Sequence, residues 1–280
     1  MPWQLANIDG RAALVIDGGS FDLNRHTKGS FGQEPLAAVA RFAELEAIAA
    51  SLAGTSADAP FDPALCGPPV PNPQKVFGIG LNYRRHAEES KMTLPTVPLV
   101  FTKFPSCLGG ATSDIVLSGD RVDWEVELVA VIGRGGRNIA AEAVWSHIAG
   151  LTLGQDVSDR RVQLAVTPPQ FSMGKSFDTY GPCGPVLASV DSFANPDDIA
   201  LSCDVAGERM QEERTSDLIF SITDLVVYLS SITTLVAGDL IFTGTPSGVG
   251  SARNRYLQPG EVVTSTMDVV GSLRNRCVQG

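Results

Sequence analysis

The stretch that most constrains the fold is residues 121–133, with the sequence RVDWEVELVAVIG. In a strand, alternate residues point to opposite faces, so Asp123, Glu125 and Glu127 share one face and the intervening apolar side chains share the other. Three neighbouring carboxylates repel one another, and a positive partner is therefore expected against them. A hard divalent cation is one solution, and solvent on the open face of an antiparallel sheet is the other.

The composition excludes two classes of partner. A net charge of −10 at pH 7 leaves no basic excess for a nucleic-acid interface. The sequence has no apolar run of transmembrane length, and its N-terminus does not resemble a signal peptide. The five cysteines are scattered and form no CxxC pair, which is typical of free thiols in a reducing compartment. We expect a cytoplasmic protein that binds neither nucleic acid nor membrane.

Residues 1–70 predict a small α+β domain. Two short apolar runs flank an Asp-Gly dipeptide at residues 9 and 10, which is typical of a hairpin turn. Residues 35–52 then have the periodicity of one amphipathic helix. A proline-rich stretch separates this unit from a larger domain, which we expect over residues 71–280.

The larger domain predicts a mixed, largely antiparallel β core with peripheral helices, and hence a β-rich α+β fold. No βαβ rhythm or internal repeat is present. Helices are expected over residues 140–148 and 221–235, the second with Ser221 as N-cap and Asp224 in its first turn. The expected strands are 75–81, 99–104, 121–133, 150–156, 201–205, 239–243, 261–270 and 272–276.

His86 and Glu89 form the first candidate for catalysis. Their spacing of three places both side chains on one face of a short polar helix or lid over residues 83–91. A carboxylate beside an imidazole fixes the tautomer and raises the basicity of the ring, which suits a general base for water. The alternative is an exposed helix with an incidental pair.

Three other polar residues lie at strand ends or in glycine-rich turns. Asp156 follows a strand and could complete a carboxylate trio with the two glutamates above, or it could cap a short helix. Lys175 could neutralise an anionic substrate or oxyanion, or it could be a surface lysine. Thr245 lies in a tight loop that could offer its hydroxyl and backbone N–H groups to a carboxylate. The sequence has no Walker loop, Rossmann fingerprint or nucleophile elbow.

Eight segments, taken in chain order, resemble the fumarylacetoacetate hydrolase family from about residue 75 to the end. They are GIGLNYRRHAEE, LVFTKFPS, DWEVELVAVIGRGGRNI, QDVSDRRVQ, GKSFDTYGPCGP, TSDLIFS, GDLIFTGTPSGVG and GSLRNR. The resemblance is to bacterial members of the acylpyruvate hydrolase or 2-hydroxyhepta-2,4-diene-1,7-dioate isomerase type. It implies a β-sandwich roll as the C-terminal domain, and the N-terminal 70 residues look like the small variable domain of many bacterial members.

The resemblance also implies a divalent metal, usually Mg²⁺ or Mn²⁺, with Ca²⁺ as a further possibility. The implied ligands are Glu125, Glu127 and Asp156. Some family members add an aspartate just before the catalytic histidine, but residues 82–86 offer no carboxylate, so three protein ligands are expected. Asp123 is not implied as a ligand, and we expect it to pair with a basic side chain such as Arg121 or Arg137.

For catalysis, the resemblance implies a dyad of His86 and Glu89 on a lid over the site, with Lys175 near the leaving group. The implied substrate contacts are Tyr83, Arg160, Gln163 and Thr245. The implied partners are a small 2-oxo acid as substrate and a second copy of the chain in a homodimer.

The function that we expect is hydrolytic C–C cleavage of a β-diketone acid, of the acylpyruvate or fumarylacetoacetate type found in aromatic catabolism. Such an enzyme is a hydrolase acting on carbon–carbon bonds in ketonic substances, in which the metal stabilises an enolate and the dyad activates water. The alternative is an isomerase or decarboxylase of a 2-oxo or 2-hydroxy-diene dicarboxylic acid, as in oxaloacetate or homoprotocatechuate metabolism. A metal-binding protein without turnover is the non-enzyme alternative.

Overall fold

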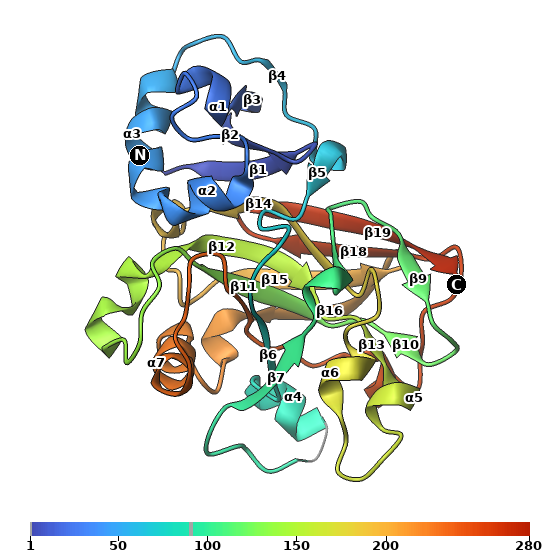
Figure 1. Ribbon diagram of the computed structural model, residues 1–280. Coiled ribbons are helices and arrows are strands. Elements are labelled where there is room, and N and C mark those ends of the chain that lie inside the picture. The colour runs from blue at the N-terminus through green and yellow to red at the C-terminus, as the bar shows by residue number, and fades with distance from the viewer. Residues whose placement is uncertain (1, 90–91) are drawn as a thin grey trace.

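The computed structural model describes residues 2–89 and 92–280 and shows a mixed, β-rich α+β fold (Figure 1). Its main layer is an open twelve-stranded sheet, within the described residues, with β4 and β7 at its edges. In spatial order the main path is β4 (Ala59–Pro60), β3 (Gly19–Asp22), β2 (Arg11–Ile16), β1 (Gln4–Ile8), β14 (Gly181–Ala188), β12 (Ile148–Gln155), β11 (Val126–Ile132), β17 (Leu240–Phe242), β6 (Val76–Gly80) and β7 (Leu99–Lys103). In addition, β5 (Cys66–Gly67) pairs with β1, and β8 (Leu108–Gly109) pairs with β14.

A smaller sheet packs against the large one. It contains β16 (Glu208–Arg214), β15 (Ala200–Val205), β18 (Val262–Met267), β19 (Gly271–Gln279) and β9 (Ile115–Leu117). A short ribbon pairs β10 (Val122–Asp123) with β13 (Ser158–Asp159). Pairings are antiparallel except for β6 with β17, β8 with β14 and β9 with β19, so the prediction of a largely antiparallel core is confirmed.

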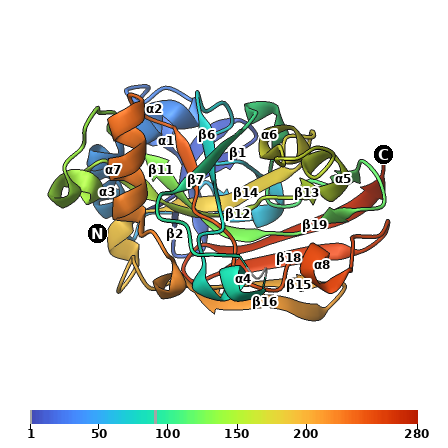
Figure 2. The same cartoon turned by 90° about the horizontal axis from the view of Figure 1, so that it is seen from below.

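The helices are short and lie at the periphery. The α-helices are α1 (Leu23–His26), α2 (Pro35–Ala40), α3 (Phe42–Leu52), α4 (Arg84–Glu89), α5 (Arg160–Gln163), α6 (Phe171–Gly174), α7 (Ile222–Ile232) and α8 (Gly250–Arg253). The 3-10 helices are η1 (Pro63–Leu65), η2 (Pro105–Cys107), η3 (Ala141–Ser146), η4 (Val190–Ser192) and η5 (Thr215–Asp217). Figure 1 shows α4, α5 and α6 on the side away from the N-terminal segment. Seen from that side, α4 and α8 lie near the smaller sheet, with α5 and α6 across from them (Figure 2). None of the described helices is long and apolar enough to span a membrane.

The central strand β11 is buried on both faces, which explains its apolar run from Leu128 to Ile132. Leu128, Ala130 and Ile132 pack in the core that contains side chains of the smaller sheet. Val129 and Val131 belong to a second core, shared with the N-terminal helices. Two apolar cores therefore hold the strand that carries the acidic residues.

The predicted alternation around the acidic residues is confirmed, although the predicted single strand is interrupted at Trp124 and Glu125. Trp124 and Val126 lie in the same core as Leu128, Ala130 and Ile132 of β11. On the acidic side, Asp123, Glu125 and Glu127 are 0%, 7% and 1% exposed. A solvated acidic face is therefore excluded, and the three carboxylates have to find partners inside the protein.

The N-terminal hairpin is confirmed, because β1 pairs antiparallel with β2 across the Asp9-Gly10 turn. The prediction of one helix over residues 35–52 is wrong, since Arg41 separates α2 from α3. At this break the guanidinium of Arg41 lies over the ring of Phe31, donates to the carbonyl of Ser30 and pairs with Glu44, so it links the preceding loop to the start of α3. Strand β1 also pairs with β14, so the large sheet runs across residue 70 and the proposed domain division stays a prediction.

Other predicted elements differ mainly at their ends. Ser221 caps α7 in a capping box with Asp224, as predicted. The helix expected over residues 140–148 is only the 3-10 helix η3, because the chain already enters β12 at Ile148. In the predicted lid over residues 83–91, α4 covers residues 84–89, and residues 90 and 91 lie outside the described chain.

The five cysteines are expected to be unreactive in the native protein. All are free and buried, and burial raises the pKa of Cys183 and Cys203 to about 12, so these thiols stay protonated at neutral pH. We predict negligible labelling by a thiol reagent at pH 8 in buffer and labelling of five thiols per chain in denaturant. Rapid native labelling would contradict the buried positions, and a count below five in denaturant would indicate a disulfide.

Candidate active site

A cavity of about 380 Å³ opens among α4, β7, α5 and the loop that follows β17. Part of its wall is polar, with His86, Glu89, Glu125, Arg160, Gln163, Lys175 and Thr245. Much of the remaining wall is apolar, with Ile79, Leu81, Met92, Leu99, Phe101, Leu164, Phe171 and Val249. The structure thus brings seven of the ten predicted site residues to one cavity, and the roles that the sequence assigned to them stay predictions.

Glu125, Glu127 and Asp156 form a buried trio whose ligand oxygens lie within 4.8 Å of one another. Neighbouring antiparallel strands create it, because Val126 pairs with Gln155 and places Asp156 beside the Glu-x-Glu segment. The backbone N–H of Asp156 donates to the carbonyl of Glu125 at 2.8 Å. The alternative role of Asp156 as a helix cap is wrong, since Asp159 caps α5.

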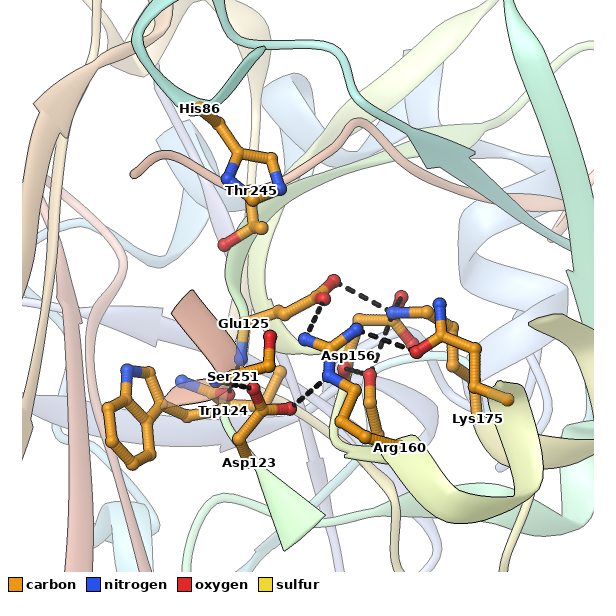
Figure 3. A network of polar contacts seen from close by, with 12 residues as sticks. His86, Asp123, Trp124, Glu125, Asp156, Arg160, Lys175, Thr245 and Ser251 are labelled. Atoms are coloured by element: carbon orange, nitrogen blue, oxygen red, sulfur yellow. Dashed lines mark hydrogen bonds and ion pairs between the residues drawn. The ribbon is translucent and has the colours of Figure 1, made fainter. Parts of the chain in front are cut away.

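Two buried lysines face the trio. Lys175 Nζ lies 2.8 Å from Glu125 Oε2 and 2.7 Å from Asp156 Oδ2, and it also donates to Ser158 Oγ (Figure 3). Lys103 Nζ lies 2.7 Å from Asp156 Oδ1 and donates to the backbone carbonyl of Lys175. Lys175 is only 2% exposed, so the surface-lysine alternative is excluded. Both ammonium groups hold Asp156 in place.

Glu127 differs from its two partners in its charge environment. It accepts the backbone N–H of Gly244 at 2.8 Å, and within the described chain it forms no ion pair. Burial raises the pKa of Glu127, and the charges of Asp156 and Glu125 raise it further. For Glu125, burial acts in the same direction, but Lys175 and Arg160 outweigh it and lower the pKa to about 2.

This environment fits a divalent cation. Four buried carboxylates, counting Asp123, face the three buried cations Lys103, Arg160 and Lys175. The uncompensated charge falls on Glu127, and a hard cation bound by three carboxylate oxygens would relieve it. Asn82 adds no ligand, because its side-chain amide binds the backbone of Thr243 and Phe220.

Arg160 is the partner of Asp123, so the prediction of Arg121 or Arg137 is wrong. Its Nε lies 2.6 Å from Asp123 Oδ1, and its Nη2 lies 2.5 Å from Glu125 Oε1. Asp123 also accepts the backbone N–H of Ser251 at 2.6 Å. The ribbon of β10 and β13 brings Asp123 and Arg160 together, although they are 37 positions apart in the sequence. Arg160 therefore fixes Glu125 as well as lining the cavity.

The His86–Glu89 pair exists in α4. His86 Nδ1 lies 3.4 Å from Glu89 Oε2, and the Glu89 carboxylate also accepts the backbone N–H of Gly248. Burial raises the pKa of Glu89, but these two hydrogen bonds, together with charge interactions with His86 and Arg253, outweigh it and lower the pKa, so the group is ionised at neutral pH. Figure 3 shows the imidazole directed toward the carboxylate cluster, and His86 lines the same cavity as Thr245.

Two predicted substrate contacts have other surroundings. Thr245 lines the cavity, but its hydroxyl donates to the carbonyl of Val126 and accepts from Gln211. Tyr83 is 0% exposed and is absent from the cavity wall, and its hydroxyl has no partner within the described residues. A role of Tyr83 in substrate binding stays a prediction.

Sequence reasoning missed Lys103, Gln155 and Gln211. Each of the three is at most 1% exposed. Lys103 binds a carboxylate of the trio, and the two glutamines bind the backbone that carries it. One signal was available for Lys103, because a lysine on the face of Leu99 and Phe101 in an apolar strand needs a buried acidic partner. The two glutamines gave no such signal, since each resembles any polar residue of a strand.

The comparisons with known proteins identify the family to which this fold belongs. The family model "Fumarylacetoacetate (FAA) hydrolase C-terminal" matches residues 75–278. The fold is thus that of a family of enzymes. The chain belongs to the fumarylacetoacetate hydrolase family, as the sequence segments predicted.

Three relatives illustrate the range of this family. The human protein named oxaloacetate tautomerase FAHD2A, mitochondrial, is 39% identical over 214 residues, which cover 75% of this chain and 68% of that protein. An HpcE-like protein from Mycobacterium smegmatis has 42% identity, covers 99% of both chains and gives a TM-score of 0.93. The maleylpyruvate hydrolase from Sphingobium sp. SYK-6, in complex with manganese (II) ion and pyruvate, has 28% identity, 99% coverage of both chains and a TM-score of 0.82.

Proposed function

We propose that this chain is a metal-dependent enzyme that interconverts the enol and keto forms of a small 2-oxo dicarboxylic acid. The observation that carries the proposal is that Glu125 of the trio and the His86–Glu89 pair line the same cavity. Relatives of 37–39% identity are named oxaloacetate tautomerases, which supports an isomerase more directly than a hydrolase. This is the isomerase branch of the alternatives open at the sequence level.

Glu125, Glu127 and Asp156 are the residues that would hold the metal. Mg²⁺ or Mn²⁺ bound there supplies a Lewis acid that polarises the 2-oxo group and stabilises developing negative charge. The manganese ion in the maleylpyruvate hydrolase structure supports this class of metal. With a divalent cation bound, Lys103, Arg160, Lys175 and the metal would outweigh the four buried carboxylates by one positive charge, which favours an anionic substrate over a neutral one.

His86 is the proposed general base. Ionised Glu89 favours the tautomer with the proton on Nδ1, which leaves the lone pair of Nε2 free for the substrate. His86 would take the proton from the enol hydroxyl and return a proton to the enol carbon. The reaction therefore consumes no water. The Gly248 N–H holds Glu89 in place during this exchange.

A specific observation favours hydrolytic C–C cleavage as a second candidate. Leu99, Phe101 and Phe171 form an apolar wall that suits the acyl group of a β-diketone acid. In this reaction His86 would activate a water rather than move a proton on carbon. The structural likeness to a maleylpyruvate hydrolase supports this candidate.

Product analysis with Mg²⁺ and Mn²⁺ separates these reactions. We expect rapid loss of enol absorbance from freshly dissolved enol-oxaloacetate, without release of pyruvate. Pyruvate from an acylpyruvate would instead support the hydrolase, and pyruvate from oxaloacetate would support a decarboxylase. If the metal-bound protein catalyses neither tautomerisation, nor hydrolysis, nor decarboxylation, the proposed enzyme is contradicted. The result would favour a metal-binding protein without activity.

We also infer a cytoplasmic homodimer. Five free buried cysteines are consistent with a reducing compartment, although the names of several relatives place those proteins in mitochondria. Exposed apolar side chains such as Val100 and Ile232 near the edge strand β7 are of the kind that a second subunit covers. Light scattering on the purified chain measures the mass directly.

A further inference from the structure

Two buried glutamines bind consecutive backbone N–H groups of the Glu-x-Glu segment. Gln155 Oε1 accepts the N–H of Glu125 at 2.9 Å, and Gln211 Oε1 accepts the N–H of Val126 at 3.0 Å. On the β17 side of β11, strand pairing begins only at Val129. Side-chain amides therefore take the place of strand pairing where the acidic segment enters the sheet.

The other end of each amide is fixed as well. Gln155 Nε2 donates to Ser265 Oγ in the smaller sheet at 2.8 Å. Gln211 extends from that same sheet, in β16, and its Nε2 donates to Thr245 Oγ1 and to the carbonyl of Pro246, both at 2.9 Å. Each glutamine thus links the acidic segment to a separate anchor.

A closed circuit of hydrogen bonds surrounds Val126. Its N–H donates to Gln211, Gln211 donates to the Thr245 hydroxyl, and that hydroxyl donates to the carbonyl of Val126 at 2.9 Å. The backbone between Glu125 and Glu127 is therefore fixed on both its donor and its acceptor. Because the amide of Gln211 uses both donors and its acceptor here, an apolar side chain of equal length removes three buried hydrogen bonds.

We propose that Gln155 and Gln211 are positioning residues that set the separation of the Glu125 and Glu127 carboxylates for a divalent cation. The inference rests on the proposed metal site. Neither side chain is a ligand, and each acts through the backbone that carries the ligands. Groups that orient metal ligands in this way typically change metal affinity by roughly 10- to 100-fold when removed.

The test compares Gln155→Met and Gln211→Met with a matched control, Asn275→Leu. Asn275 is a buried amide on β19 that donates to the carbonyls of Gly110 and Ser113, so its loss is also destabilising but lies outside the site. The full chain is stripped with a chelator and titrated with Mn²⁺, and free Mn²⁺ is followed by electron paramagnetic resonance. We expect both glutamine variants to bind Mn²⁺ roughly 10- to 100-fold more weakly, and Asn275→Leu to bind like wild type.

Thermal unfolding of the same samples separates stability from positioning. If Gln155→Met does not fold, Ser265→Ala removes one of the two partners of Gln155 Nε2, leaving Cys203 Sγ at 3.4 Å, and should give a smaller loss of affinity in the same direction. Wild-type affinity in the folded glutamine variants, or an equal loss in Asn275→Leu, would overturn the inference. Failure of the wild-type chain itself to bind Mn²⁺ would instead overturn the proposed metal site.

Discussion

The His86→Asn variant is expected to lose about 10²- to 10⁴-fold in kcat, the usual contribution of a general base, while keeping wild-type affinity for Mn²⁺. His86 contacts Glu89 and the cavity, and it forms no contact with Glu125, Glu127 or Asp156 that would make it a ligand. Asparagine retains a polar side chain but has no basic nitrogen. Steady-state kinetics on the preferred substrate and a parallel Mn²⁺ titration measure the two effects separately.

Helix α4 provides a matched control for the dyad. Glu88→Gln and Glu89→Gln remove the same charge from adjacent residues, but Glu88 is exposed, whereas Glu89 binds His86 and Gly248. Only Glu89→Gln should lower kcat. Normal turnover by His86→Asn, or equal losses in the two glutamate variants, would contradict a general-base role for this pair.

The Glu127→Gln variant is expected to lose both metal binding and activity. A neutral amide replaces the one carboxylate of the trio that has no ion pair within the described chain, so the site loses the charge that a divalent cation would neutralise. We expect the affinity for Mn²⁺ to fall by more than roughly 100-fold, beyond the range for groups that only orient ligands. Calorimetric titration with Mn²⁺ and an activity assay at saturating metal measure both losses.

Unfolding experiments on metal-free protein show whether the Glu127→Gln variant loses metal binding simply because it is unfolded. The pKa of Glu127 is raised in the folded protein, so its ionised form opposes folding at pH values above its ordinary pKa. Neutral glutamine removes that repulsion, and the metal-free variant should unfold at or above the wild-type temperature at pH 7.5. A folded variant with normal activity would contradict the proposed site, and a marked fall in stability would contradict the charge balance described for the trio.

The sequence predicted the parts of the fold that depend on local patterns. Strand alternation placed the acidic residues on one face of the strand, and the Ser221 capping box fixed the start of α7. The break at Arg41 was missed because the periodicity of residues 35–52 does not encode the contacts of Arg41 with Phe31 and Ser30 in the preceding loop. The early end of η3 was missed for a similar reason, since sheet pairing at Ile148 overrides local helix propensity.

The site was predicted by residue type and family order, but its internal contacts were not. Arg160 was expected as a substrate contact, and only the β10–β13 pairing shows that it binds Asp123 and Glu125. Lys175 was expected near the leaving group, and the structure shows its ammonium group held between two carboxylates of the trio. Such long-range pairs depend on how the strands meet, so no spacing in the sequence reports them.

The proposed metal site is tested most directly by a crystal structure grown with MnCl₂ and oxalate, with anomalous data collected at the manganese edge. We expect one anomalous peak within bonding distance of Glu125, Glu127 and Asp156, with oxalate completing the coordination shell on the cavity side. We also expect His86 to face the oxalate without contacting the metal. Absence of a peak at the trio, with Lys175 still paired to Glu125 and Asp156, would contradict the proposal that these carboxylates form a catalytic metal site.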